Sequence, residues 1–174
     1  AQEGSHTPNF NGTPMRAGYS FAGWTPEVAE FVTENVVYTA TWTINDYTIT
    51  FDARGGDVSP AEITVTYGHP VGTLPVPTRE GFDFIGWFDS AGTLISSERF
   101  LNPGEVSEDT VYTAYFKRKE FNVRFLDNDG SVISEAKVKC GHSAIAPNPP
   151  IHDGFNFTGW DKKFDYITGD LDVT

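Results

Sequence analysis

One heptapeptide pattern, Gly-aromatic-x-Phe-x-Gly-Trp, occurs three times in this chain, at residues 18–24, 81–87 and 154–160. The tryptophans that end the three copies are 63 and 73 residues apart, which is the length of a small module. Self-similarity at such a period indicates an array built from one supersecondary unit. We therefore expect three repeats, and arrays of this kind usually present surfaces or span distance.

The segments that flank the motif also recur, and they alternate apolar with polar or small residues. They align as a first strand (47–51 with 121–125), a second strand (63–67 with 136–140) and a last strand (36–42 with 110–116 and 171–174). Alternation with a period of two predicts strands that have one buried face. No stretch keeps a helical period, so we expect any helix to be short.

Turn-forming residues separate these strands. Residues 54–57 and 127–130 are expected to form hairpin loops between the first and second strands. Proline-rich passages at 75–79 and 147–150 should cross their modules as extended connections, because proline cannot donate a ladder hydrogen bond. Repeat two alone has about eleven extra residues after its tryptophan, around 89–92, and insertions of this kind map to loops.

The sequence is out of phase with its own repeat. Residues 1–43 read as a partial first repeat that lacks its first two strands, 44–117 as a complete repeat, and 118–174 as a third repeat truncated in its last strand. Modules of this size lie near the lower limit for a self-sufficient core. The expected fold class is mainly β, α+β at most, with small cores filled by the aromatic residues that make up 14% of the chain.

Charge and cysteine content narrow the range of partners. The net charge is −12, which argues against nucleic acid, anionic lipid and sulfated glycans, since all of these need a concentrated basic surface. Cys140 is the single cysteine, so no disulfide can form within the chain. Because Cys140 aligns with Tyr67, we expect a small buried apolar residue there. No apolar run reaches the roughly 18 residues that span a bilayer.

Taken together, these residues make the chain resemble the Listeria–Bacteroides repeat, also called the internalin-type B-repeat. The resemblance is carried by the strand 47–52, by Tyr67-Gly68, by Leu-Pro-x-Pro-x-Arg-x-Gly-Phe-x-Phe-x-Gly-Trp at 74–87, and by Val-Tyr-Thr-Ala at 111–114. It implies tandem β-grasp-like modules, with little helix, on secreted or surface-anchored bacterial proteins that are often adhesins. It also implies that the first and last strands of a module pair at the centre of its sheet.

This strand order has a consequence for repeat three. If its last strand is truncated, the edge of 121–125 is exposed and forms a template for another chain. We therefore expect strand exchange or poor order at 121–125, and chain-to-chain strand pairing at the truncated ends.

The motif has a physical interpretation of its own. In an extended segment Phe82 and Phe84 point to one side, and Gly86 permits a bulge or a close backbone approach that re-aims Trp87. Three identical copies favour buried core residues. The alternative is an exposed ring that stacks on a sugar.

Histidines recur once per module, at His6, His69 and His142. A zinc site needs three or four ligands that converge on one ion, and His152 adds no second ligand at helix or finger spacing. We expect turn-stabilising histidines and no metal.

Residues 127–130, Asp-Asn-Asp-Gly, echo part of a calcium loop. Phe125 and Ala136 stand where an EF-hand needs acidic ligands, so a hairpin turn is the preferred interpretation, with a weak cation contact as the alternative.

Enzyme motifs are missing from the sequence, which contains no Gly-x-Ser-x-Gly elbow, phosphate loop or His-Glu-x-x-His. Acidic pairs such as Glu108-Asp109 lie in predicted turns. The leading hypothesis is a non-enzymatic tandem-repeat spacer and interaction region of an exported bacterial surface protein or adhesin. It has no catalytic residue and no cofactor, and it is extracellular or at the cell surface.

The alternative hypothesis is a module that binds a glycan or a host protein through exposed aromatic residues and the insertion at 89–102. The expected partner is a host or cell-surface protein, with no nucleic acid and no membrane span in this segment.

Overall fold

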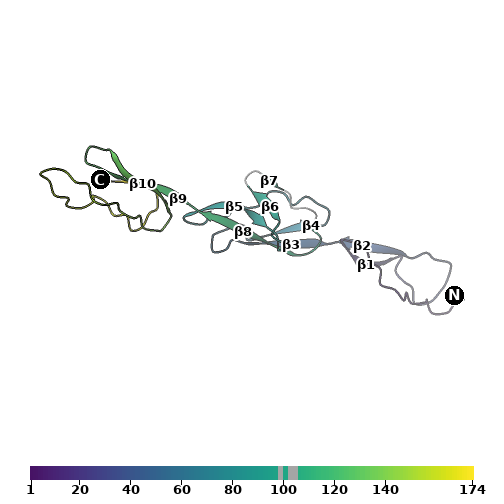
Figure 1. The fold of residues 1–174 in the computed structure, drawn as a ribbon. Helices are drawn as coiled ribbons and strands as arrows, with labels where there is room; N and C mark the ends of the chain where they lie inside the picture. The colour runs from purple at the N-terminus through teal and green to yellow at the C-terminus, as the bar shows by residue number, and fades with distance from the viewer. Residues whose placement is uncertain (98–99, 102–105) are drawn as a thin grey trace.

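The computed structural model describes residues 1–97, 100–101 and 106–174. The regular structure in these residues consists of strands, which group into a two-stranded, a six-stranded and a three-stranded sheet. The three units follow one another along an elongated molecule, with the termini at opposite ends (Figure 1). The mainly β fold class is therefore confirmed.

The strands place their more buried residues at every second position most clearly at 110–116 and 120–125, as a period of two requires. In the described residues they are β1 (Tyr19–Thr25), β2 (Thr39–Ile44), β3 (Asp46–Asp52), β4 (Glu62–Thr66), β5 (Phe82–Phe88), β6 (Leu94–Ser97), β7 (Phe100–Leu101), β8 (Thr110–Arg118), β9 (Glu120–Leu126), β10 (Val132–Lys139) and β11 (Leu171–Val173).

Repeat two forms the six-stranded sheet, in the order β4-β3-β8-β5-β6-β7. Its first and last strands, β3 and β8, pair in parallel at the sheet centre, with Phe51 opposite Tyr112, as the family resemblance implies. The inward side chains form a core around Trp87, which is 1% exposed. The Trp87 indole N–H donates to the Pro75 carbonyl oxygen at 2.8 Å, so the extended proline passage is tied to the core.

The motif glycine forms the expected bulge. The pairing of β5 with β8 shifts register between Phe84 and Gly86, and the pairing of β1 with β2 shifts between Phe21 and Gly23. A Cβ on Gly86 would lie 2.6 Å from the backbone oxygen of Ser96. Glycine is therefore needed in repeat two for a close backbone approach as well as for the bulge.

The insertion of repeat two is more regular than expected. Residues 89–92 form the expected turn, but the residues that follow form β6 and β7, which extend the sheet beyond β5, so the expectation of a loop is wrong for that part of the insertion. The turn before β6 is held by the Asp89 carboxylate, which accepts the backbone N–H groups of Ala91 and Thr93. Positions 98–99 and 102–105, including the end of the insertion at Asn102, lie outside the described residues.

Repeat three forms the sheet β10-β9-β11. Residues Leu171–Val173 of β11 pair in parallel with Val123–Phe125 of β9. The expectation that the edge of 121–125 is exposed is therefore wrong for 123–125, which the three residues of β11 cover. The core of this unit is built around Val123, Phe125 and Ile167.

The third copy of the motif does not form a strand. Residues 154–160 are described but irregular, and Phe155 is 81% exposed, so the expectation of three equivalent buried motifs is wrong here. In repeat two the motif strand pairs with 113–118 of β8, and the aligned positions of repeat three start at Thr174. The motif of repeat three therefore has almost no partner strand within this sequence.

Repeat one contains a motif strand, β1, and a last strand, β2, and residues 1–45 form no other strand. Its last strand begins at Thr39, although the pattern predicts a strand from residue 36. In repeat two the matching residues 110–112 pair with β3, and repeat one has no such strand. Within residues 1–45, all of which the structure describes, no side chain is buried.

Candidate functional site: the junctions between repeats

The repeats are joined by single residues. Asn45 alone separates β2 from β3, and Lys119 alone separates β8 from β9. The last strand of one repeat therefore runs almost directly into the first strand of the next.

At the first junction, Asn45 is hydrogen-bonded on both sides. Its N–H donates to the carbonyl oxygen of Gly18, the first motif glycine of repeat one, at 2.9 Å. Its carbonyl oxygen accepts the N–H of Tyr67, which follows β4 of repeat two, also at 2.9 Å. One backbone unit thus fastens the motif of one repeat to the second strand of the next.

The second junction repeats this geometry. The Lys119 N–H donates to the Gly81 carbonyl oxygen and the Lys119 carbonyl oxygen accepts the Cys140 N–H, each at 2.9 Å. Two junctions with different side chains therefore share one backbone arrangement, which makes a defined joint and not a flexible linker.

Glycine is required at both joints. Gly18 and Gly81 have φ angles of +73° and +74°, in the left-handed region. A Cβ on Gly18 would lie 2.0 Å from the Tyr67 ring, and one on Gly81 would lie 2.7 Å from Cys140 Sγ. The residue after the second strand therefore packs directly against the motif glycine of the preceding repeat.

Cys140 is half-buried in the structure, so the expectation of a buried apolar residue is wrong. It lies at the joint and not within the core of its own repeat. The Arg118 guanidinium donates to the Cys140 carbonyl oxygen at 3.0 Å and lies 5.0 Å from the centroid of the Phe82 ring. The Arg79 guanidinium also lies over the Phe82 ring, 4.2 Å from its centroid.

The four tryptophans differ in exposure. Trp87 is buried, whereas Trp24, Trp42 and Trp160 are half-buried. Trp160 still packs on the core, with its ring centroid 4.9 Å from that of Phe125, although residues 154–160 do not form a strand. The interpretation of the motif tryptophan as a core residue is confirmed in repeat two.

The recurrent histidines lie in separate repeats and are not brought together. The His6 ring is tilted by 35° against the Phe31 ring, with the two centroids 4.6 Å apart. His69 Nδ1 lies 3.2 Å from the Tyr67 carbonyl oxygen, and the backbone N–H of His142 donates to the Lys139 carbonyl oxygen. Within the described part of the chain, no group of three or more His, Cys, Asp and Glu side chains could hold a metal ion.

The contact of His152 is not predicted from the sequence. Its Nε2 lies 2.9 Å from an Asp127 carboxylate oxygen, so it ties the proline-rich passage to the turn at 127–130. The alignment of the repeats could have pointed to this residue, because His152 stands in the position of Arg79, two residues before the motif glycine. The turn itself is confirmed, since Asp127 and Ser131 close it with a backbone hydrogen bond of 2.8 Å.

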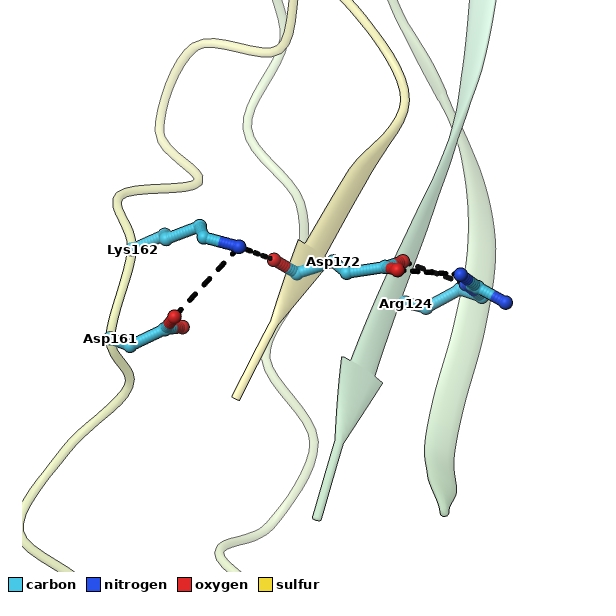
Figure 2. Close-up of polar contacts among 4 residues, drawn as sticks. All are labelled: Arg124, Asp161, Lys162 and Asp172. Carbon is cyan, nitrogen blue, oxygen red and sulfur yellow. Dashed lines mark hydrogen bonds and ion pairs between the residues drawn. The ribbon is translucent and has the colours of Figure 1, made fainter. Parts of the chain in front are cut away.

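A polar cluster fastens β11 to β9 (Figure 2). Arg124 Nε and Nη2 donate to the two carboxylate oxygens of Asp172, at 2.7 and 2.5 Å, and Lys162 Nζ donates to the Asp172 carbonyl oxygen at 2.6 Å. The hydrogen bond from Arg124 is the main cause that lowers the pKa of Asp172. This pair could not be predicted from the repeat pattern, because Thr50 and Val111 hold the matching positions in repeat two.

Aspartates in the turn before the last strand have a structural role. Asp109 accepts the backbone N–H of Thr48, and Asp170 accepts that of Asn122, both at 2.8 Å. Each carboxylate thus joins the start of the last strand to the start of the first. The predicted turn at Glu108-Asp109 therefore ties strands together.

The family model of the Listeria-Bacteroides repeat domain matches residues 47–113 and 121–172. The chain is 34% identical over 157 residues to a predicted membrane protein of Evansella cellulosilytica, which covers 84% of this chain and 23% of that protein. It is 30% identical over 181 residues to a predicted Gly-rich membrane protein of the same organism, covering 91% and 21%.

A third relative is Internalin H of Listeria monocytogenes, which is 31% identical over 131 residues, covering 72% of this chain and 23% of that protein. The chain thus spans less than a quarter of the length of each of these relatives. No solved structure matches the chain. Within the residues that the structure describes, none belongs to a helix with the length and hydropathy needed to cross a bilayer.

Proposed function

Because this chain belongs to the Listeria-Bacteroides repeat family, we propose that it is a non-enzymatic spacer and interaction region of an exported bacterial surface protein. The observation that carries this proposal is the shared geometry of the two joints. Single-residue connections with matched backbone hydrogen bonds transmit orientation from one repeat to the next. Such an array can hold another part of the protein at a set distance.

A surface or membrane-associated location is supported by the names of the relatives, two of which are called membrane proteins and one Internalin H. The extracellular placement and the adhesin role are our proposal for the whole protein, with a host or cell-surface protein as its partner. The net charge of −12 suits a self-repelling, soluble array.

The spacer role is tested by small-angle X-ray scattering. A compact domain of this length would have a radius of gyration of about 16 Å, so a stiff row of three repeats should give a clearly larger value. Insertion of Gly-Gly-Ser after Lys119 breaks the hydrogen bonds of the second joint. We expect it to broaden the distribution of interatomic distances.

The matched control places the same three residues in the turn at 127–130, which lies in a hairpin and not at a joint. This variant should scatter like the parent chain. If both insertions leave the scattering unchanged, or if the parent chain already behaves as a flexible string, the joints do not set the shape and the spacer role is wrong.

The alternative, a module that binds a glycan or a host protein, is supported by one observation. Repeat one has a groove with aromatic walls, which include Phe10, Phe21 and Trp24. Trp87 offers no such surface, because it is 1% exposed. A receptor role would therefore use repeat one and not the motif of repeat two.

A further inference from the structure

Repeat two lies in the middle of the row, and the chain passes through it from β3 to β8 (Figure 1). Asn45 alone connects β3 to the repeat before it, and Lys119 alone connects β8 to the repeat after it. These connections have no spare length to take up an extension of the chain. Tension along the row therefore acts on the first residue of β3 and on the last residue of β8.

The strands β3 and β8 are neighbours in the sheet and run parallel, with residues 49–52 paired to residues 110–113. Because tension pulls the start of β3 and the end of β8 in opposite directions, it slides the two strands past each other along their length. The hydrogen bonds of a parallel pair are evenly spaced along the strands, so all of them carry load at the same time. A pull on the starts of both strands would instead open the ladder one bond after another.

The ladder between β3 and β8 is covered on its inner side by the core. Ile49 is 0% exposed, and Phe51 and Tyr112 are 4% and 3% exposed. Water competes for a stretched hydrogen bond, and the core keeps water away from this side of the ladder. Hydrogen bonds in such surroundings are electrostatically stronger than in water, so the ladder is well placed to resist load.

A side-chain contact extends the ladder at the point where tension enters β3. The Asp109 carboxylate, in the turn before β8, accepts the backbone N–H of Thr48 at 2.8 Å. Thr48 directly precedes the first residue of the ladder, so this bond is loaded together with the backbone bonds. Hydrogen bonds with an ionised acceptor are stronger than neutral ones.

We propose that repeat two is a force-bearing module, in which the ladder between β3 and β8, together with the bond from Thr48 to Asp109, forms a mechanical clamp. The clamp keeps the repeat folded while tension acts along the row. This inference rests on the spacer role and deepens it, because a spacer keeps its length under load only if its repeats stay folded. The two proposals can fail separately, since scattering reports the shape without load and force measurements report the resistance to load.

Single-molecule force spectroscopy of the full chain tests the clamp through its dependence on direction. Two variants each carry one pair of introduced cysteines as attachment points, in a Cys140→Ala background that leaves no other thiol. The first pair, Thr43→Cys with Glu120→Cys, pulls the start of β3 against the end of β8. The second pair, Thr43→Cys with Glu108→Cys, pulls the starts of both strands apart. All three positions are exposed and lie outside the ladder.

We expect the first pair to unfold repeat two at a force at least about twofold higher than the second pair, because several hydrogen bonds must break together and not singly. The fully extended chain between the attachment points spans about 260 Å in the first pair and about 220 Å in the second. The length of the unfolding step therefore identifies the event as the unfolding of repeat two.

A matched pair of aspartate substitutions separates resistance to force from ordinary stability. Asp109 accepts a backbone N–H within the clamp, whereas Asp89 accepts two backbone N–H groups in the turn before β6, outside it. Asp109→Ala should lower the unfolding force of the first attachment pair, and Asp89→Ala should leave that force unchanged. Both substitutions should lower the free energy of unfolding measured in urea, because each removes hydrogen bonds.

Equal unfolding forces for the two attachment pairs would overturn the proposal, because the resistance would then not depend on how the ladder is loaded. A loss of force in Asp89→Ala as large as that in Asp109→Ala would overturn it as well, since the load would then be spread over the whole repeat. The near-ultraviolet circular dichroism of each variant checks that its aromatic core is packed before the chain is pulled.

Discussion

At the residue scale, the first glycine of the motif has the same backbone conformation in all three repeats but different packing contacts. The first motif glycine has a positive φ in all three repeats, at Gly18, Gly81 and Gly154, so its conformation is a local property. Its contact is not local, because Gly18 and Gly81 face the next repeat, whereas no described atom lies within 4 Å of a Cβ placed on Gly154. Conformation and packing can therefore be separated by mutation.

We predict that Gly81→Ala destabilises the chain more than Gly154→Ala. Both variants place an L-residue at positive φ, which costs about 1–2 kcal/mol. Only Gly81→Ala also sets a methyl group 2.7 Å from Cys140 Sγ. The free energy of unfolding, measured by urea denaturation, reports the difference.

Cys140→Ala provides the check on this explanation. It removes the sulfur and leaves Cys140 Cβ as the nearest atom, 3.4 Å from the new methyl group. Gly81→Ala in the Cys140→Ala background should then cost about as much as Gly154→Ala. Equal effects of the two glycine substitutions in the parent chain would contradict a packed joint.

At the element scale, strand formation depends on a partner as much as on pattern. Residues 36–38 and 154–160 have the alternation of a strand, but neither segment forms one. Their counterparts in repeat two pair with β3 and β8 respectively. Backbone N–H and C=O groups are satisfied in a ladder only where a second strand is present.

The short strand β11 illustrates the opposite case. It has only three residues, yet it pairs with β9, aided by Arg124 and Asp172. Both side chains are exposed, so the pair is weak by itself and helps mainly by fixing the register of the strand.

We predict that β11 loses protection from hydrogen exchange in acid. Asp172 has a lowered pKa in the folded state, so its stabilising contribution is complete above the unfolded value of about 3.9. That contribution is lost as the pH falls through the lower, folded value. The protection factors of Leu171–Val173 should therefore decrease below about pH 4. NMR measurements over about four pH units, from pH 6 to pH 2, would show this decrease.

Asp172→Asn tests the assignment. It should lower the protection of β11 at neutral pH and reduce the step in acid, whereas Asp153→Asn, in an exposed turn away from β11, should change neither. An acid step of unchanged size in Asp172→Asn would show that another carboxylate controls this strand.

At the scale of the whole molecule, the three repeats differ in completeness although they share a sequence pattern. The six-stranded sheet of repeat two and the three-stranded sheet of repeat three enclose buried clusters, whereas residues 1–45 enclose none. In a linear array each unit interacts with its neighbours only, so stability is distributed unit by unit.

We predict that repeat one opens before repeat two. Hydrogen exchange measured by mass spectrometry should be faster for amides of β2 than for amides of β3, because β2 has one partner strand and β3 has two. The hydrogen bonds of Asn45 connect repeat one to repeat two and should slow exchange in β2. Gly18→Ala disturbs this joint, so it should widen the difference in exchange rate between β2 and β3. Equal exchange of β2 and β3 in the parent chain would mean that the two repeats unfold as one unit.

The sequence by itself determined the features that depend on neighbouring residues. Period-two alternation predicted the strands, the motif glycines predicted the bulges, and the Asp-Asn-Asp-Gly stretch predicted the turn at 127–130, because φ preferences and side-chain alternation act within a few residues. It also predicted the family, through spacing repeated along the chain.

Only the tertiary structure decided the features that need segments distant in sequence. The joints connect Gly18 to Asn45 and Gly81 to Lys119, and the β11 contact connects Arg124 to Asp172 across 48 positions. Residues 154–160 are irregular, although the motif of repeat two lies in β5, which pairs with β8. Packing and hydrogen-bond completion depend on which surfaces meet, and a local pattern does not contain that information.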